Sequence, residues 1–258
     1  MEQNIKISAI IPTCDRMDYL PEAIDSIRAQ TLPPTEIIVV NNGKNHLPEG
    51  SLGDDVQILN LEPYVGVSAA RNAGEDTANG DYLAFLDDDD LWDKDFLKHL
   101  ANKIESENAA CAFGTRVKFF PNGKTKAYKN KLPQKIPTPN SANFYKAPGF
   151  GGTNFLVWQK AFFTVGGFDE NLKVAEDQDL FVRIVSAGFK VSTAPEAICL
   201  VRQHSMPRLR YDSSFGGLQP YYLKHKKKLN VLQHLHFVWR YLVSIRKHVF
   251  RLLKLKKT

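Results

Sequence analysis

The hydrophobic positions in the first half of the chain alternate between short apolar runs and stretches with helical spacing. Four runs have the length and the β-branched or aromatic content of buried strands: Ile7–Ile11, Glu36–Val40, Val56–Leu61 and Tyr82–Leu86. Between and after them, apolar residues recur every three or four positions, which predicts helices over residues 20–27, 68–77 and 94–107. Strands that alternate with helices predict an α/β fold with a mostly parallel central sheet flanked by helices.

The second half of the chain is less regular. Cys111–Phe120 and Lys190–Val201 have the composition of strands, and Ala175 opens a helical stretch that runs through Ser186. Residues 121–150 are rich in Pro, Lys and Asn and show no period, which predicts a long loop. No Asp or Glu occurs between Asn108 and Phe168. The lysines of this loop therefore face either a phosphate or an anionic acceptor, or only solvent.

The tail differs from the rest of the chain in charge. Residues 213–258 hold 11 Lys and Arg and no Asp or Glu, so the net charge of +6 combines a tail of +11 with a preceding segment of −5. Such a distribution is not the footprint of a nucleic-acid-binding domain, and we expect no nucleic acid partner. The tail also has helical periodicity, with one apolar face: Val231, Leu235, Val238, Leu242, Ile245, Val249 and Leu252.

A basic amphipathic helix of this kind predicts binding to an anionic membrane surface. The alternative is a helix that packs on its own domain or on a partner subunit. Met1–Lys6 is polar and no apolar run reaches the roughly 18 residues of a membrane span, so we expect neither a signal peptide nor a spanning helix. Three widely spaced cysteines fit a reducing compartment. We therefore expect a cytoplasmic protein, peripheral on the inner face of the membrane if the tail binds lipid.

Four consecutive aspartates, Asp87–Asp90, follow the fourth predicted strand. Adjacent carboxylates repel one another, and a bound divalent cation would justify their placement because hard cations prefer carboxylate oxygens. A solvated acidic turn is the alternative. The polar segments Pro12–Arg16 and Asn41–Gly43 also follow predicted strands. Because ligands of parallel α/β sheets bind beyond the carboxyl ends of the strands, all three segments are candidates for one site.

Six segments in this order resemble the family 2 inverting glycosyltransferases with a GT-A fold: IIPTCDR, VVNNG, GVSAARNAG, DYLAFLDDDDLW, GGTNFLVWQKAFFTVGGFDE and AEDQDLFVRIVSAG. The resemblance covers roughly residues 5–204. It implies a GT-A catalytic domain over residues 1–212, with a nucleotide-binding half to about residue 110 and an acceptor half over 111–212. Residues 213–258 would form a C-terminal helical extension.

The resemblance implies Mn²⁺ or Mg²⁺ as cofactor, because such an ion stabilises the diphosphate leaving group of a nucleotide-sugar donor. It assigns Asp87 and Asp89 to the metal and Asp88 to the ribose. Asp90 would orient its neighbours or cap the next helix. His204 matches a position where some relatives have a histidine that contacts the metal or the diphosphate; an ordinary surface or core histidine is the alternative.

The same resemblance assigns the donor nucleotide to the first loop and to two other positions. Pro12, Thr13, Asp15 and Arg16 match the first nucleotide-binding loop. Arg71 matches a residue that faces the nucleotide or its phosphates, with a surface ion pair as the alternative. Asn41 stands where the family has an aspartate that contacts the base. Its amide can accept from uracil or thymine or donate to cytosine, so a UDP-sugar is favoured but not required.

Inversion at the anomeric carbon needs a base for the acceptor hydroxyl, and the resemblance assigns this role to Asp177. Glu176 beside it would raise its pKa, and helix capping by Asp177 is the alternative. Glu176, Gly152 and Trp158 fall on the acceptor and sugar side, although Trp158 could equally be a packing residue. The predicted activity is metal-dependent transfer of a sugar to a hydroxyl of a growing glycan or glycolipid in bacterial surface polysaccharide or lipid-linked oligosaccharide synthesis. The alternative is an inactive nucleotide-binding or scaffolding relative.

Three other classes of protein fit the sequence less well. Phosphatases of the haloacid dehalogenase type carry their aspartates after the first strand, whereas here they follow the fourth. An EF-hand loop requires a glycine at its sixth position. A dinucleotide-binding fold requires GxGxxG, which does not occur in this sequence.

Overall fold

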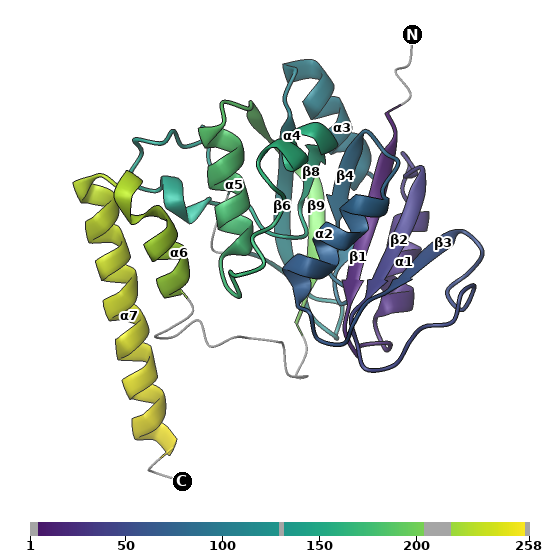
Figure 1. The fold of residues 1–258 in the computed structure, drawn as a ribbon, viewed down its shortest axis with the longest axis horizontal. Coiled ribbons are helices and arrows are strands. Elements are labelled where there is room, and N and C mark those ends of the chain that lie inside the picture. Colours follow the sequence, from purple (N-terminus) through teal and green to yellow (C-terminus); the bar gives the residue numbers. More distant parts are fainter. Residues whose placement is uncertain (1–4, 129–131, 204–217, 256–258) are drawn as a thin grey trace.

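A nine-stranded sheet forms the centre of the protein in the computed structural model, which describes residues 5–128, 132–203 and 218–255 (Figure 1). The order of the strands is β3-β2-β1-β4-β8-β6-β9-β5, and β7 pairs with β6 outside this path. The strands are β1 (Ile7–Thr13), β2 (Glu36–Asn41), β3 (Val56–Asn60), β4 (Tyr82–Phe85), β5 (Leu91–Trp92), β6 (Cys111–Phe119), β7 (Thr125–Ala127), β8 (Phe155–Trp158) and β9 (Val191–Arg202).

The first four strands are parallel, as predicted, and they bring their carboxyl ends to one edge of the sheet. The second half of the sheet is mixed, because β8 runs antiparallel to both β4 and β6. The α/β fold with flanking helices is confirmed, while the prediction of a mostly parallel sheet holds only for the first half. The structure also contains three short strands that the pattern did not indicate, β5, β7 and β8.

Helices cover both faces of the sheet. One layer consists of α1 (Leu20–Arg28) and α3 (Phe96–Glu107), and the other includes α2 (Val67–Thr77), α4 (Gln159–Thr164) and α5 (Glu176–Ser186). Alternate residues of β1 point to opposite faces of the sheet. Ala9 and Ile11 pack in the hydrophobic core under α1, and Ile10 packs in the hydrophobic core under α2. Apolar residues on both faces explain why the central strands read as continuous hydrophobic runs rather than as alternating patterns.

The long aperiodic loop packs into the core. Within residues 121–150, a short 3₁₀ helix, η1 (Phe144–Lys146), contributes two buried aromatic rings, Phe144 and Tyr145, and Phe150 is buried beside them. Irregular backbone held by buried aromatics leaves no helical or strand period in the sequence, so hydrophobic pattern analysis did not detect this packing.

The tail shares the same core. It forms α6 (Leu218–His225), a 3₁₀ turn η2 (Lys226–Lys228) and α7 (Val231–Leu255). Tyr221 is fully buried and its hydroxyl donates to the Tyr145 carbonyl at 3.0 Å, while Phe237 packs in the same cluster. The predicted domain boundary at residue 212 lies outside the described residues. No helix within them is long and apolar enough to cross a membrane.

Asp179 anchors the tail to helix α5. Its carboxylate is fully buried and lies 2.7 Å from His225 Nε2, and it accepts bonds from Arg183 Nε at 2.7 Å and Lys224 Nζ at 3.0 Å. Burial opposes ionisation, but the bond to His225 and the charges of Arg183 and Lys224 outweigh it and lower the pKa of Asp179 to about 2. This interaction holds α6 against the helix that begins with Glu176 and Asp177.

Asp179→Asn should destabilise the fold by about 3 kcal/mol at neutral pH, since it removes one partner of a buried ion pair. Urea unfolding followed by circular dichroism measures the change. The folded pKa lies below the ordinary aspartate value of about 3.9, so this stabilisation is complete above that pH and is lost as the pH falls through about 2. Asp25→Asn, which breaks an exposed pair with Arg28, is the matched control and should behave as wild type. Equal midpoints for the two variants would contradict the anchoring role.

Candidate functional site

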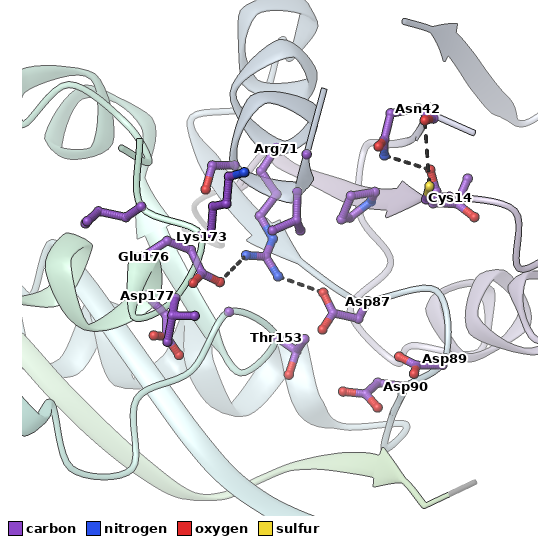
Figure 2. Close-up of a pocket in the computed structure, with 18 of the residues that line it drawn as sticks. Cys14, Asn42, Arg71, Asp87, Asp89, Asp90, Thr153, Lys173, Glu176 and Asp177 are labelled. Carbon is purple, nitrogen blue, oxygen red and sulfur yellow. Dashed lines mark hydrogen bonds and ion pairs between the residues drawn. The ribbon is translucent and has the colours of Figure 1, made fainter. Parts of the chain in front are cut away.

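A cavity of about 610 Å³ opens at the carboxyl ends of the parallel strands (Figure 2). The three polar segments singled out in the sequence all contribute to its lining, through Thr13 and Arg16, Asn42, and Asp87. Its other side is formed by Gly152, Thr153, Glu176 and Asp177 from the second half of the chain. The volume is in the range typical of small-molecule sites.

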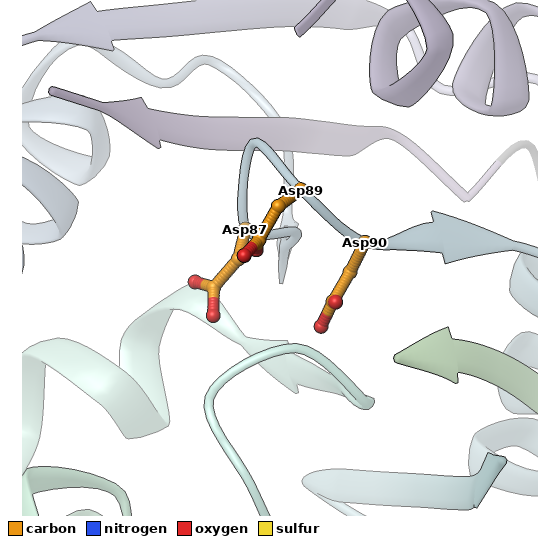
Figure 3. Close-up of side chains that lie close together, drawn as sticks. All are labelled: Asp87, Asp89 and Asp90. Carbon is orange, nitrogen blue, oxygen red and sulfur yellow. The ribbon is translucent and has the colours of Figure 1, made fainter. Parts of the chain in front are cut away.

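Three of the four consecutive aspartates converge on this cavity. Asp87, Asp89 and Asp90 lie on the turn between β4 and β5, and each offers a carboxylate oxygen within 4.8 Å of the others (Figure 3). Three hard oxygen donors in one place suit Mg²⁺ or Mn²⁺. Asp90 therefore belongs to the cluster and caps no helix; the residue that precedes α3 is Asp95. Its Oδ1 also accepts the backbone N–H of Arg202 at 3.0 Å.

Asp88 points the other way. It is fully buried, its Oδ2 accepts the Thr13 hydroxyl at 2.8 Å, and Arg16 Nη2 lies 3.1 Å from Oδ1. Burial raises its pKa to about 7 although Arg16 and Thr13 oppose the shift. Asp88 does not line the cavity, so this placement does not favour the predicted ribose contact. Instead it ties the aspartate turn to the end of β1.

Arg71 joins the aspartate cluster to helix α5. Its guanidinium donates to Asp87 Oδ1 at 2.7 Å and to Glu176 Oε1 at 3.4 Å, and it stacks at 5.0 Å from the centroid of the Phe168 ring (Figure 2). With 2% of its surface exposed, it is a buried residue and not part of a surface ion pair. A Cβ at position 152 would lie 2.5 Å from Arg71 Nη2, so only glycine leaves room for the guanidinium.

Glu176 and Asp177 begin α5 and face the cavity. Burial raises the pKa of Glu176 to about 7, and the neighbouring charge of Asp177 adds to the shift while Arg71 opposes it. Burial also raises the pKa of Asp177, against the charge of Arg116 and a 2.7 Å bond from the Gln178 N–H. Two carboxylates with raised pKa values in one cavity are candidates for proton exchange with a bound ligand.

Two residues predicted to bind the nucleotide hold loops beside the cavity. Asp15 is exposed and accepts the Lys44 N–H at 2.8 Å and the Tyr64 hydroxyl at 3.0 Å. The Asn41 side chain is buried and bonds Asn45 and Asn60, and neither Asp15 nor Asn41 lines the cavity. The asparagine that does line it is the next one, Asn42, which follows β2 and donates its side-chain amide to the Thr13 carbonyl at 2.9 Å.

Trp158 requires a correction. It pairs with Tyr82 at the first residue of β4, whereas the aspartates follow the last residue of that strand. Its ring therefore lies at the opposite edge of the sheet from the cavity, beside Lys160, and not at an acceptor or sugar site. Pro12 and Gly152, predicted to contact the nucleotide and the acceptor or sugar, line the cavity. His204 lies outside the described residues.

Arg116, Tyr128 and Lys173 also line the cavity and were not predicted individually (Figure 2 labels Lys173). The only sequence signal for Arg116 was the acid-free stretch around it. Nothing local in the sequence indicates that β6 reaches the cavity, because that depends on its pairing with β8 and β9.

The family model described as Glycosyl transferase family 2 matches residues 8–166, which is more than half of the chain. The uncharacterized glycosyltransferase YwdF of Bacillus subtilis is 40% identical over 105 residues, covering 40% of this chain and 39% of the relative. An uncharacterized glycosyltransferase of Rickettsia bellii is 31% identical over 69% of this chain and 27% of the relative. The matches thus span less than two fifths of these two relatives. The putative colanic acid biosynthesis glycosyl transferase WcaA of Escherichia coli is 27% identical, with 89% of this chain and 85% of WcaA covered.

Solved structures of Staphylococcus aureus TarS share the fold. The complex of TarS with UDP-GlcNAc aligns with a TM-score of 0.65 at 21% identity, covering 87% of this chain and 65% of TarS. The complex with UDP aligns with a TM-score of 0.59 at 22% identity, covering 77% and 61%. At this level of identity the comparison concerns the fold and not the ligand.

Asp87→Asn, Asp89→Asn and Asp90→Asn should each weaken Mn²⁺ binding by at least about tenfold, since each removes one charged oxygen donor. Isothermal titration of Mn²⁺ into the purified protein measures the affinity. Asp93→Asn, an exposed aspartate just beyond the cluster, is the control and should bind as wild type. Wild-type affinity in the Asp90 variant would remove Asp90 from the site.

Proposed function

Because the chain belongs to glycosyl transferase family 2, we propose that it is a metal-dependent inverting glycosyltransferase that moves a sugar from a nucleotide diphosphate donor, preferably a UDP-sugar, to a hydroxyl of a growing glycan. The observation that carries this proposal is the composition of one cavity. It contains a cluster of three aspartates and, joined to it through Arg71, the carboxylate pair Glu176 and Asp177.

The aspartate side of the cavity suits the leaving group. A Mn²⁺ or Mg²⁺ ion held by Asp87, Asp89 and Asp90 would act as a Lewis acid on the diphosphate, whose charge grows as the glycosidic bond breaks. Arg16 lies against this cluster, with Nη1 2.8 Å from Asp89 Oδ2, and adds positive charge at the same end. Phosphate oxygens favour such a guanidinium, so Arg16 and Arg71 are candidates to contact the diphosphate.

The α5 side of the cavity suits the acceptor. In direct displacement the acceptor oxygen forms a bond to the anomeric carbon while the bond to the diphosphate breaks and its electron pair leaves with the phosphate. The hydroxyl proton passes to Asp177, whose raised pKa makes it a stronger base than an exposed aspartate. Glu176 is held by Arg71 and orients this end of the helix relative to the metal cluster.

The donor and the biological setting rest on relatives. TarS, which shares the fold, has been crystallised with UDP and UDP-GlcNAc, and this supports a UDP-sugar. WcaA is named for colanic acid biosynthesis, which supports a role in bacterial surface polysaccharide or lipid-linked glycan synthesis. An inactive nucleotide-binding relative is the competing proposal, and the complete carboxylate set speaks against it.

Asp177→Asn should reduce sugar transfer by at least about a hundredfold, since an amide cannot accept the hydroxyl proton. The assay follows UDP release from a panel of UDP-sugars with Mn²⁺ and a glycan acceptor mixture. Wild-type transfer should rise with pH through a limb above the usual aspartate range, because burial raises the pKa of Asp177. Thermal stabilisation by UDP and Mn²⁺ should survive the substitution. Unchanged turnover in the variant would refute the base assignment.

We also propose that α7 binds an anionic membrane surface. Val231, Leu235, Val238 and Leu242 lie on one helix face and are 53% to 73% exposed, while Phe237 on the other side packs into the core. The three lysines of η2 beside this face are exposed. A second copy docked face to face would bring two acid-free, basic tails together, whether the helices pair parallel or antiparallel. Anionic lipid satisfies both the apolar face and the charge.

Leu235→Glu should release the protein from vesicles that contain anionic phosphatidylglycerol, because it places a charge in the apolar face. Co-sedimentation with phosphatidylglycerol–phosphatidylcholine vesicles and with pure phosphatidylcholine measures binding. Phe163→Glu alters an exposed aromatic of α4 and is the matched control. Substitution is preferable to deletion of the tail, since Tyr221 and Phe237 belong to the core. Equal sedimentation of the two variants would refute lipid binding through α7.

A further inference from the structure

The hairpin of β6 and β7 concentrates positive charge on one face. The register pairs Val117 with Ala127 and Lys118 with Lys126, and directly opposed residues of an antiparallel pair project to the same side. Arg116 and Tyr128 each lie two positions from a lysine of the Lys118–Lys126 pair, so they project to the same face as these lysines and lie closer to the cavity. Both cations on β6 lie against the tyrosine ring, Arg116 at 5.2 Å and Lys118 at 5.3 Å from its centroid. The face therefore presents two cations against one aromatic ring, with Lys126 directly opposite the second of them.

These cations have no counter-charge in the hairpin. Arg116, Lys118 and Lys126 form no ion pair with any carboxylate in the parts of the chain that the structure describes. The sequence contains no Asp or Glu from position 109 to position 168, which spans the whole hairpin and the loop after it. Like charges that are directly opposed destabilise a strand pair. Lys118 opposite Lys126 is thus an arrangement that an anion bound on this face would stabilise.

One end of this face lies inside the cavity. Arg116 and Tyr128 line it together with Asp177, whereas Lys118 and Lys126 lie further along the hairpin and outside the lining. The guanidinium of Arg116 packs directly over the backbone of Gly151, where a side chain would collide with it. The cations therefore form a track that leads from the candidate base outward along the hairpin.

The track is separate from the end of the cavity that suits the donor diphosphate. Arg16 and Arg71, which flank the aspartate cluster, are both paired with its carboxylates, whereas Arg116 approaches from β6 on the α5 side. A donor that fills the cavity would leave Lys118 and Lys126 uncovered, since they lie beyond it. An extended ligand that enters along the hairpin would cover them and bring its end to Asp177.

We propose that Arg116, Lys118, Lys126 and Tyr128 form the acceptor-binding track, and that the acceptor is an anionic glycan chain with phosphate or carboxylate groups close to the hydroxyl that receives the sugar. This inference rests on the proposed glycosyltransferase function. Arg116 can bind either anion through two parallel N–H groups. Tyr128 lines the cavity and supplies an aromatic ring that a sugar can contact.

Binding of three labelled oligomers of equal length tests the track: polygalacturonate for carboxylate, phosphorylated dextran for phosphate, and neutral dextran. Fluorescence anisotropy is measured with UDP and Mn²⁺ present, so that the donor end is occupied. At least one anionic oligomer should bind at least about tenfold more tightly than neutral dextran, with affinity that falls as salt rises. Which anion binds distinguishes a phosphate-bearing acceptor from a carboxylate-bearing one.

Two variants locate the binding. The Arg116→Gln variant and the Lys118→Gln/Lys126→Gln variant should each bind the anionic oligomer about tenfold or more weakly than the wild type does. Their affinity for neutral dextran should be unchanged. Lys94→Gln/Lys98→Gln removes two exposed charges, one just before α3 and one in its first turn, and should bind as wild type. Equal affinity for anionic and neutral oligomers, or equal loss in the hairpin and control variants, would overturn the proposal.

The two proposals fail in different ways. If UDP with Mn²⁺ does not raise the melting temperature of the wild-type protein, the glycosyltransferase proposal fails. If UDP stabilises the wild type and the Lys118→Gln/Lys126→Gln variant equally but the oligomers bind without regard to charge, only the acceptor track fails.

Discussion

The buried ion pairs of Arg71 hold the two sides of the cavity together. A guanidinium removed from water needs anionic partners, and Arg71 finds one at the end of β4 in Asp87 and another at the start of α5 in Glu176. The glycine at position 152 and the ring of Phe168 complete its surroundings. Three segments that are far apart in the sequence are thereby positioned by one side chain, and the distance between the aspartate cluster and Asp177 depends on it.

Two carboxylates in the first turn of α5 show how burial and partners divide roles on one helix. Asp177 and Asp179 are two residues apart, so they point in different directions around the helix axis. Asp177 faces the cavity, and burial raises its pKa. Asp179 faces the tail, where His225 and Lys224, together with Arg183 of its own helix, lower its pKa to about 2. The first therefore suits proton transfer, while the second remains ionised and fastens α6 to the domain.

The distribution of charged residues is consistent with the proposed function. Acidic groups gather where a metal and a base are needed, and the basic groups of the β6–β7 hairpin and of the tail lie without nearby acids in the sequence. The hairpin leads into the cavity beside Asp177, and α7 presents its apolar face away from the core. An anionic chain approaching along the hairpin and an anionic lipid surface beneath α7 would both be compatible with this distribution.

Local pattern was sufficient for much of the fold and part of the site. Apolar runs predicted the first four strands, and their parallel order implied that Thr13 and Asp87 would meet at one edge. The family resemblance added Arg71 and Asp177, both of which line the cavity.

Other assignments depended on tertiary structure. Which of the adjacent aspartates or asparagines faces the cavity is set by backbone direction at the turn, so Asp90 and Asn42 replace Asp88 and Asn41 there. Trp158 lies at the far edge because β8 runs antiparallel to β4. Arg116 comes to the cavity beside Asp177 only through strand pairing across distant segments. Hydrophobic periodicity records which residues are buried, but the partners of a buried or paired residue are chosen by contacts between segments that the linear pattern does not contain.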